Sequence, residues 1–479
     1  MGNKYDANLI VIGAGSGGLV TAYIAAAIKA RVILIEKGEM GGDCLNTGCV
    51  PSKSLIASAK FIHEIKNSGN FGIKSASCDF DFADIMSRVH SVIESIKPHD
   101  SVERYTSLGV EVIKGDAKII SRNLVSVNGT QYSARSIVIA AGAEPFVPPI
   151  KGMDQVNYYT SDTIWNLTKL PENLVILGGG PIGCELSQCF ARFGSKVTLV
   201  EMSDQIMGRE DPEFAEHIAG RFKAEGITVL DHHRAKEVIL KDGKKYLVCE
   251  RDGSTIEVEF DQMLLALGRA AQIEGYGLKQ LNIPITPRNT IDANEYLQAG
   301  YSNIYAVGDV VGPYQFTHAA AHQAWYACIN ALFSPFKKFK VDYSVLPWAT
   351  YTDPEVARVG LNERDAKEKK ISYEVTVYDL GQLDRARTDG HAEGLIKVLT
   401  VPGKDQILGV TIMGKHAGDL IAEFVLAMRH QLGLNKILGT IHAYPTWMEA
   451  NKYVAGNWKK AHAPAWALNL LEKFHRMRR

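Results

Sequence analysis

The sequence predicts an α/β protein with two nucleotide-binding domains built on parallel sheets. The main observation is that one glycine-rich pattern occurs twice, near residue 13 and near residue 178, each time between an apolar run and a helical run. The chain has 479 residues, which is too long for one hydrophobic core and suggests two or three domains. Its formal net charge of zero argues against a nucleic-acid-binding surface.

The first copy of the pattern follows residues 9–12, an apolar run short enough for a buried parallel strand. Its glycines are Gly13, Gly15 and Gly18. An Ala-rich helical run follows, then a second strand at 32–35 that ends at Glu36. Such glycines allow a tight turn and bring the backbone close to a pyrophosphate, while the acid binds ribose hydroxyls. This order predicts a Rossmann-like dinucleotide site.

The second copy follows an apolar run at residues 174–177. Its glycines are Gly178, Gly180 and Gly183, and its acid is Glu201. The first glycine and the acid are 23 positions apart in both copies. Two nucleotide sites in one enzyme indicate a relay of electrons between two cofactors.

Two cysteines, Cys44 and Cys49, lie in a glycine-rich approach to a helix that Pro51 is suited to begin. The N-terminus of a helix stabilises a thiolate, and such a dithiol can cycle between a disulfide and a thiolate pair. Two unrelated core cysteines are the alternative for an arbitrary pair at this spacing. A zinc site is less favoured, because no second pair of cysteines or histidines lies nearby, and we expect no metal site.

The stretch 41–53 resembles the redox-active signature of the class I pyridine nucleotide-disulfide oxidoreductases, in the branch of dihydrolipoamide dehydrogenase and mercuric reductase. The resemblance implies FAD at the first glycine pattern and a nicotinamide cofactor at the second. It places Cys49 against the flavin and makes Cys44 the thiol that meets the substrate. Lys53 and Glu185 match an ion pair near the flavin's reactive nitrogen.

Residues 304–309 resemble the family's second flavin motif, in which Asp309 would hold the ribityl chain. Further cofactor contacts are expected at Gly42, Lys53, Gly142, Gly268 and Ala319. Glu201 favours NADH over NADPH, because a carboxylate repels a 2′-phosphate.

The resemblance also implies the domain order. A discontinuous FAD-binding domain would cover residues 1–150 and 281–342, with a nicotinamide-binding domain at 151–280. Residues 343–479 would form an α+β dimerisation domain, because 347–360 resemble its opening. A homodimer is therefore expected, in which each subunit completes the active site of its partner.

The chain departs from the family's disulfide reductases near its C-terminus. Their catalytic histidine corresponds to Tyr444 here, while the glutamate that orients it remains as Glu449 and His442 lies two residues earlier. Tyrosine titrates near pH ~10 and histidine near ~6.5, so tyrosine is a poor proton shuttle at neutral pH. Mercuric reductases resemble the chain in having tyrosine here, and soft thiolates bind Hg(II) directly. Either His442 replaces the missing histidine for a small-molecule disulfide, or the substrate is a thiol-bound soft metal. A different substrate is a third alternative, because the last cysteine is Cys328 and the vicinal C-terminal pair that delivers mercury in dedicated mercuric reductases is missing.

The sequence also bears on where the protein is located and on the role of its C-terminal tail. No signal peptide or membrane-spanning run is apparent and the cysteines are sparse, so a cytoplasmic enzyme is expected. Residues 466–479 read as an amphipathic helix, which we expect to be a packed or frayed end rather than a membrane anchor. The basic tail and the missing histidine leave one alternative open: a redox-sensing or electron-supply flavoprotein that acts through a protein partner.

Overall fold

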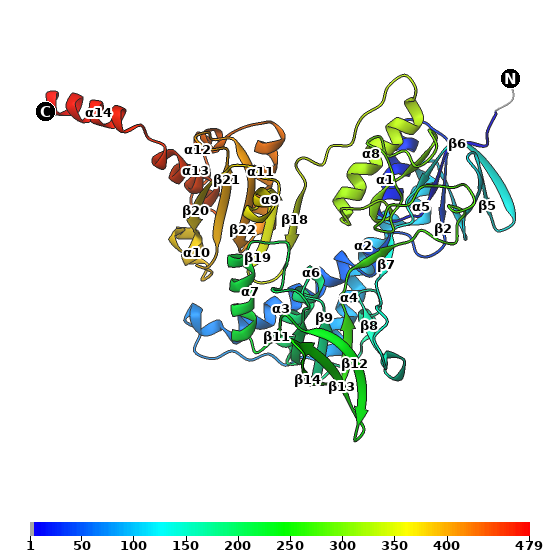
Figure 1. The fold of residues 1–479 in the computed structure, drawn as a ribbon, viewed down its shortest axis with the longest axis horizontal. Helices are drawn as coiled ribbons and strands as arrows, with labels where there is room; N and C mark the ends of the chain where they lie inside the picture. Colours follow the sequence, from blue (N-terminus) through cyan, green and yellow to red (C-terminus); the bar gives the residue numbers. More distant parts are fainter. Residues whose placement is uncertain (1–3) are drawn as a thin grey trace. The chain divides into compact units, whose positions relative to one another are not determined.

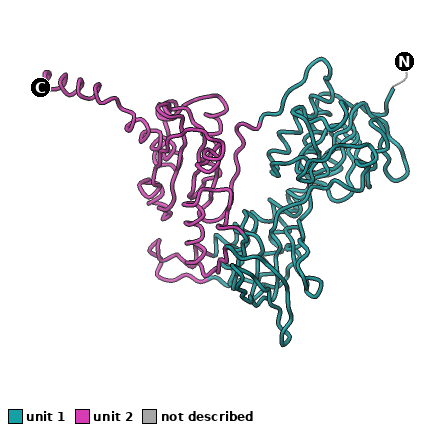
Figure 2. The backbone as a smooth tube through the Cα atoms, viewed as in Figure 1, with its two compact units in different colours: residues 1–62, 78–202, 232–342 teal, residues 63–77, 203–231, 343–479 magenta. Residues whose placement is uncertain are grey.

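The computed structural model describes residues 4–479, which divide into two compact units (Figures 1 and 2). The first unit runs to residue 62 and also contains residues 78–202 and 232–342. The second unit contains residues 63–77, 203–231 and 343–479.

The first unit contains a seven-stranded sheet in the order β3-β2-β1-β6-β5-β4, with β17 also paired to β6. Its strands are β1 (Ala7–Ile12), β2 (Val32–Glu36), β3 (Val110–Lys114), β4 (Lys118–Ser121), β5 (Leu124–Val127), β6 (Thr130–Ile139) and β17 (Ile304–Ala306). Strands β3, β2, β1, β6 and β17 are parallel. The chain therefore returns to this sheet after residue 300. Asn128 and Gly129 join β5 to β6 as a hairpin, as their sequence predicts.

Alternate residues of this sheet enter two separate cores. Ile10 and Ile33 face one core, whereas Val11 and Leu34 face the other, and all four are fully buried. Burial on both faces explains why the parallel strands read as continuous apolar runs. Helix α1 (Ser16–Ala27) packs against α8 (Thr317–Phe333) on the side of Val11.

The same unit contributes four parallel strands, in the order β10-β9-β15-β8, to a second, five-stranded sheet that also includes β11 (Thr228–Leu230). The four parallel strands are β8 (Tyr159–Thr160), β9 (Asn173–Leu177), β10 (Lys196–Val200) and β15 (Gln262–Leu265), and helix α6 (Pro181–Phe193) follows β9. An antiparallel three-stranded meander is formed by β12 (Arg234–Lys241), β13 (Lys244–Arg251) and β14 (Ser254–Phe260). Strands β7 (Ala143–Pro145) and β16 (Arg269–Ala271) pair antiparallel.

The second unit contains an antiparallel sheet in the order β18-β19-β22-β21-β20. Its strands are β18 (Pro347–Thr350), β19 (Glu355–Gly360), β20 (Glu374–Asp379), β21 (Leu395–Thr400) and β22 (Ile407–Gly414). Its helices include α7 (Pro212–Ala224), α9 (Glu363–Glu368), α10 (Asp384–Thr388), α11 (Ala417–Arg429), α12 (Leu434–Leu438), α13 (Glu449–Ala461) and α14 (Ala465–Met477). Buried side chains of α11 and α13, including Phe424 and Val454, share a core with Ile412 of β22. The α+β character expected of this region is confirmed.

A buried lysine ties several segments of the second unit together. The side chain of Lys397, on β21, is 4% exposed and lies 2.9 Å from Asp211. It also forms ion pairs with Glu213 and Glu363. Burial alone would lower the pKa of Lys397, but the three carboxylates outweigh that effect and raise it.

Replacing Lys397 with methionine is expected to destabilise the second unit by about 3 kcal/mol. The substitution leaves Asp211 buried without its cation, while Glu213 and Glu363 are partly exposed and can be hydrated. Urea unfolding followed by circular dichroism measures the change. Lys244→Met is the control, because Lys244 pairs with Glu259 on the surface, and its transition should coincide with that of the parent protein. Coincident transitions for all three proteins would contradict the prediction.

The C-terminal residues form the expected helix. None of the residues of α14 is buried, and the helix is the red segment at the C-terminus in Figure 1. The expectation of a packed end is therefore not met among residues 4–479, while fraying of this helix stays a prediction. Among the residues that the structure describes, no helix combines the length and apolarity needed to cross a membrane.

Candidate active site

The two glycine-rich turns have nearly the same geometry. Gly13 and Gly178 have φ values of +100° and +104°, in the left-handed region. A Cβ atom on Gly18 would lie 1.8 Å from the carbonyl oxygen of Gly13, and one on Gly183 would lie 1.9 Å from that of Gly178. Each helix therefore begins so close to its turn that only glycine fits.

Each turn is closed by the acid at the end of its second strand. The Ala14 amide donates to Glu36 Oε2 at 2.5 Å, and the Gly179 amide donates to Glu201 Oε2 at 2.6 Å. The N-cap residues of α1 and α6, Gly15 and Gly180, provide no side-chain cap. Amide groups at both helix N-termini can thus receive a pyrophosphate, with an acid beside them for ribose hydroxyls.

The dithiol segment contacts the first turn. Gly42 has φ +57°, and a Cβ atom there would lie 2.6 Å from the Cα of Gly15. Cys44 belongs to the short helix α2 (Gly42–Asn46), and Cys49 is the first residue of α3 (Cys49–Lys66). A group bound at the first turn would therefore lie next to the segment that carries both sulfurs.

The two thiols titrate very differently. The Cys44 thiol donates a hydrogen bond to the sulfur of Cys49, which is the main reason that the pKa of Cys49 falls to about 6. Thr317, whose Oγ1 lies 3.6 Å from that sulfur, and the charge of Lys53 lower it further. Desolvation raises the pKa of Cys49, but this residue is exposed, and the rise does not outweigh the combined lowering by its neighbours. The same hydrogen bond and burial raise the pKa of Cys44, so one proton stays on Cys44 while Cys49 is a thiolate.

In the reduced protein, alkylation of Cys49 by iodoacetamide is expected to slow as the pH falls through about 6. The lowered pKa keeps the thiolate present above this pH and protonates it below. The rate of alkylation against pH, with the modified residue identified by mass spectrometry, measures the inflection. Thr317→Val should move the inflection upward because it removes one hydrogen bond to the thiolate. An inflection near ~8.5, the ordinary value for cysteine, would contradict the prediction.

Lys53 and Glu185 meet as the sequence predicted. Lys53 Nζ lies 2.8 Å from Glu185 Oε2, and the Glu185 side chain is 5% exposed. Lys53 belongs to the helix that begins at Cys49, and Glu185 belongs to α6, which begins at the second turn. The ion pair therefore joins the dithiol helix to the second nucleotide turn.

The remaining expected cofactor contacts are Asp309, Ala319, Gly142 and Gly268. Burial raises the pKa of Asp309 to about 6, and Arg269 acts against that rise. Gly308, beside it, donates to the Gln323 side chain of α8 at 2.5 Å, and Ala319 is buried in the first turn of that helix. Gly142 and Gly268 both have left-handed φ values, +72° and +95°.

Sequence reasoning missed Arg269, which gathers three carboxylates. Its guanidinium pairs with Asp43, lies 3.2 Å from Asp162 and lies 4.0 Å from Asp309. It also donates to the carbonyl of Ala143 at 2.7 Å. Because Asp43 precedes Cys44, this arginine links the dithiol segment to the acid expected to hold the flavin. The available signal was an arginine directly after Gly268, which does not reveal its distant partners.

Residues 161–165 also hold the dithiol segment in place. The Trp165 indole donates to the carbonyl of Thr47 at 2.7 Å, and the Thr47 hydroxyl lies 3.4 Å from Asp162. The dithiol segment is thus held at Asp43 and at Thr47, on both sides of Cys44. No sequence pattern indicated this contact.

The C-terminal candidates belong to the second unit and have two different environments. Tyr444 is 69% exposed and its hydroxyl donates to Asp384 at 3.2 Å, a bond that raises the pKa of Tyr444. The His442 side chain is 4% exposed and its Nε2 lies 2.9 Å from Glu423. The structure therefore does not bring His442 to the side of Tyr444.

Glu449 is buried and is already hydrogen-bonded. It accepts from the Tyr453 hydroxyl at 3.2 Å and from the Thr446 amide at 3.3 Å. The glutamate that would orient a histidine at position 444 is thus held by a neighbouring tyrosine.

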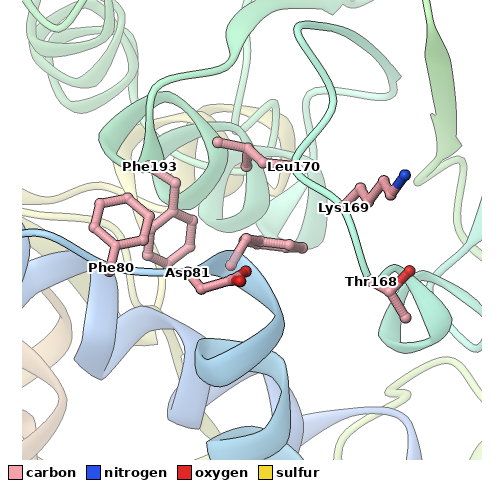
Figure 3. A pocket seen from close by; sticks show the side chains of 7 residues that line it. Phe80, Asp81, Thr168, Lys169, Leu170 and Phe193 are labelled. Atoms are coloured by element: carbon pink, nitrogen blue, oxygen red, sulfur yellow. The ribbon is translucent and has the colours of Figure 1, made fainter.

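A concave pocket in the first unit contains none of these residues (Figure 3). It is lined by Phe80, Asp81, Phe82, Thr168, Lys169, Leu170 and Phe193. Phe80 and Phe82 both pack edge-on against Phe193. The Asp81 carboxylate caps α4 (Phe82–Ile96) by accepting from Ala83 at 2.8 Å. The lining therefore serves packing and helix capping, and the candidate site remains the dithiol segment with its two turns.

Comparisons with known proteins agree with this geometry. Residues 7–324 match the family model of pyridine nucleotide-disulphide oxidoreductases, and residues 346–455 match the dimerisation domain of that family. A mercuric reductase from Bacillus cereus is 33% identical over 449 residues, which are 94% of this chain and 71% of that protein. A dihydrolipoyl dehydrogenase from Chlamydia trachomatis is 34% identical over 447 residues, 92% of this chain and 94% of that protein.

Two solved structures extend the comparison. The Cu(II) complex of the HOCl-induced flavoprotein disulfide reductase RclA from Escherichia coli is 25% identical, with a TM-score of 0.83. That match covers 95% of this chain and 99% of the other. LpdA from Mycobacterium tuberculosis has a TM-score of 0.86 at 23% identity, over 94% of this chain and 99% of the other, and shows the fold alone.

Proposed function

Because this chain belongs to the pyridine nucleotide-disulphide oxidoreductase family, we propose that it passes electrons from NADH to the Cys44–Cys49 pair and then to a soft metal ion bound by thiols. It is a flavin-dependent enzyme of that family. The observation that carries the proposal is the position of Cys44 and Cys49 on a segment that contacts the first nucleotide turn through Gly42. The matches cover more than nine-tenths of the chain, so an electron-supply protein without turnover of its own is not favoured.

The first turn fits FAD. Gly42 contacts Gly15, and the half-buried Asp309 lies 4.0 Å from Arg269, so an acid suited to ribityl hydroxyls and a cation come from the same unit as the dithiol. When bound, FAD supplies two-electron transfer between a nicotinamide and a disulfide. We assign this role to residues 1–150 and 281–342, and the nicotinamide to residues 151–280.

The second turn fits NADH better than NADPH. The Glu201 carboxylate accepts from the Gly179 amide, so it is held at the place where the adenosine ribose is expected. A 2′-phosphate there would meet this negative charge at close range. Steady-state rates with NADH and NADPH test the assignment, and equal specificity constants would contradict it.

The chain's own residues divide the sulfur chemistry between them. Cys49 remains a thiolate because Cys44, Thr317 and Lys53 stabilise its charge. Cys44 is the thiol that meets the substrate, and it must lose its proton to attack a disulfide or bind a metal ion. The thiolate of Cys49 then attacks the Cys44 sulfur in a mixed disulfide, which releases the substrate thiolate and restores the Cys44–Cys49 bond.

A disulfide substrate needs a proton carrier that Tyr444 does not provide. Both thiolates released from a disulfide must be protonated, whereas Tyr444 is a phenol whose pKa is raised further by Asp384. His442 is engaged with Glu423. A soft metal ion is bound by two thiolates directly and needs no such carrier, which favours thiol-bound Hg(II) or a similar ion. A small-molecule disulfide such as lipoamide is the second candidate, favoured by the match to dihydrolipoyl dehydrogenases.

We also propose a homodimer in which Tyr444 and Glu449 of one subunit complete the site of the other. The matched dimerisation domain supports this arrangement.

NADH oxidation assayed in parallel with Hg(II) bound by excess thiol, lipoamide and oxidised glutathione tests the substrate. We expect the highest specificity constant with Hg(II). Robust turnover of lipoamide that is lost in His442→Ala but retained in Tyr444→Phe would contradict the metal assignment. Such a result would show that His442 carries the proton.

A further inference from the structure

Helix α14 presents an apolar face that is not buried by the described residues of its own unit. The helix begins at Ala465, ten residues after the end of the matched dimerisation domain at residue 455. Trp466, Leu470, Phe474 and Met477 are spaced by four, four and three residues, which places them on one side of an α-helix. They are 72%, 61%, 42% and 78% exposed. These four residues are named the α14 apolar face.

The rest of the helix is strongly basic. Residues 465–479 carry four cationic side chains, Lys473, Arg476, Arg478 and Arg479, and one carboxylate, Glu472. The whole chain has a formal net charge of zero, so this excess of positive charge is local. Lys473 and Arg478 fall at the two margins of the α14 apolar face, and Arg478 lies 5.3 Å from the Phe474 ring.

We propose that α14 binds the surface of an anionic lipid bilayer, with its axis in the plane of the membrane. The apolar face would enter the boundary between headgroups and acyl chains, while the flanking cations contact lipid phosphates. Tryptophan and long basic side chains are suited to that boundary, because each combines an apolar body with a polar end. This inference goes beyond the proposed reaction and does not depend on the substrate.

The length and charge of the helix favour a lipid surface over other occupants. Its 13 residues span roughly 20 Å, whereas crossing a bilayer takes about 20 apolar residues. A second copy packed parallel along the same face would bring the cations of both helices together, and an antiparallel copy would offer them Glu472 as the one carboxylate of residues 465–479. An anionic leaflet offers negative charge along the whole helix.

The experiment is cosedimentation of the full-length holoprotein with lipid vesicles. Vesicles of phosphatidylcholine alone are compared with vesicles that also contain phosphatidylglycerol, at low and high salt. We expect binding to the anionic vesicles only, weakened at least several-fold by high salt because the surface charges are screened. Absence of binding to anionic vesicles would overturn the proposal.

Two matched variants test the orientation of the helix. Leu470→Glu places a charge on the α14 apolar face and should weaken vesicle binding at least ~10-fold. Leu468→Glu makes the same chemical change at a residue that is 53% exposed but lies on the opposite side of the helix. It should bind within about 2-fold of the parent protein, because its charge faces water. Equal losses in both variants would overturn the proposal.

Two further measurements separate this proposal from its competitors. Sedimentation velocity without lipid should be unchanged in Leu470→Glu, and a shift to a smaller species would assign the apolar face to self-association instead. NADH oxidation should be the same in both variants, since α14 carries none of the proposed reaction residues. Failure of the proposed reaction would therefore leave the vesicle result intact, and the reverse also holds.

Discussion

Cys49→Ser is expected to lose substrate reduction by at least ~10³-fold while NADH still reduces the bound flavin. The substitution removes the thiolate that Cys44, Thr317 and Lys53 stabilise. Cys44→Ser should lose substrate reduction to a similar degree, because the thiol that meets the substrate is gone. Steady-state NADH oxidation with Hg(II) or lipoamide measures the loss, and electron transfer to an artificial one-electron acceptor measures the reaction that survives.

The two variants should differ in their absorption spectra. Cys44→Ser keeps the Cys49 thiolate and should show a long-wavelength band from its contact with the flavin, which fades at low pH. Cys49→Ser should lack this band. Cys78→Ser is the control, because Cys78 is a half-buried cysteine outside the dithiol segment and should turn over normally. A band in Cys49→Ser, or none in Cys44→Ser, would reverse the assignment of the two sulfurs.

Tyr444→His is expected to raise turnover of lipoamide or oxidised glutathione by roughly 10²-fold. An imidazole there would supply the proton that the phenol holds too tightly, since the pKa of Tyr444 is raised by Asp384. Glu449 is already buried five positions away and could orient the new ring, as its counterpart does in the disulfide reductases that the sequence resembles. Rates measured against pH should show a new inflection near ~6.5.

Comparing disulfide substrates with thiol-bound Hg(II) shows whether the effect of Tyr444→His comes from proton transfer. Tyr444→Phe is the control, because phenylalanine cannot carry a proton, and its disulfide turnover should stay as low as that of the parent protein. Turnover of thiol-bound Hg(II) should not rise in Tyr444→His, since metal binding by thiolates needs no proton carrier. No gain with either disulfide would show that more than the missing imidazole separates this enzyme from the disulfide reductases.

Much of the candidate site could be predicted because its physics is local. A strand that ends in a tight turn and continues as a helix requires glycine where φ is positive and where the backbones approach closely, as at Gly13 and Gly18. The dithiol could also be predicted from the sequence, since Cys44 and Cys49 lie in one short stretch at the start of a helix. The turns of the meander are local in the same way, because the Asp-Gly pairs at 242–243 and 252–253 favour two-residue hairpin turns.

The contacts of Arg269, Trp165 and His442 were beyond local reasoning. Arg269 reaches Asp43 across 226 positions of sequence, and Trp165 reaches Thr47 across 118. His442 was a candidate to replace the missing histidine, but its Nε2 is hydrogen-bonded to Glu423. Such partners are selected by packing between distant elements, and no short pattern encodes them.

The sequence alone was sufficient to specify which chemistry the chain carries: a dithiol, two dinucleotide turns and a tyrosine in place of a histidine. Only the folded arrangement decided how those groups behave. It set the pKa of Cys49 to about 6 through a hydrogen bond from Cys44, and it left the apolar face of α14 uncovered. The physical reason is that residue type and backbone preference act over a few positions, whereas charge stabilisation and burial depend on neighbours brought together by the whole fold.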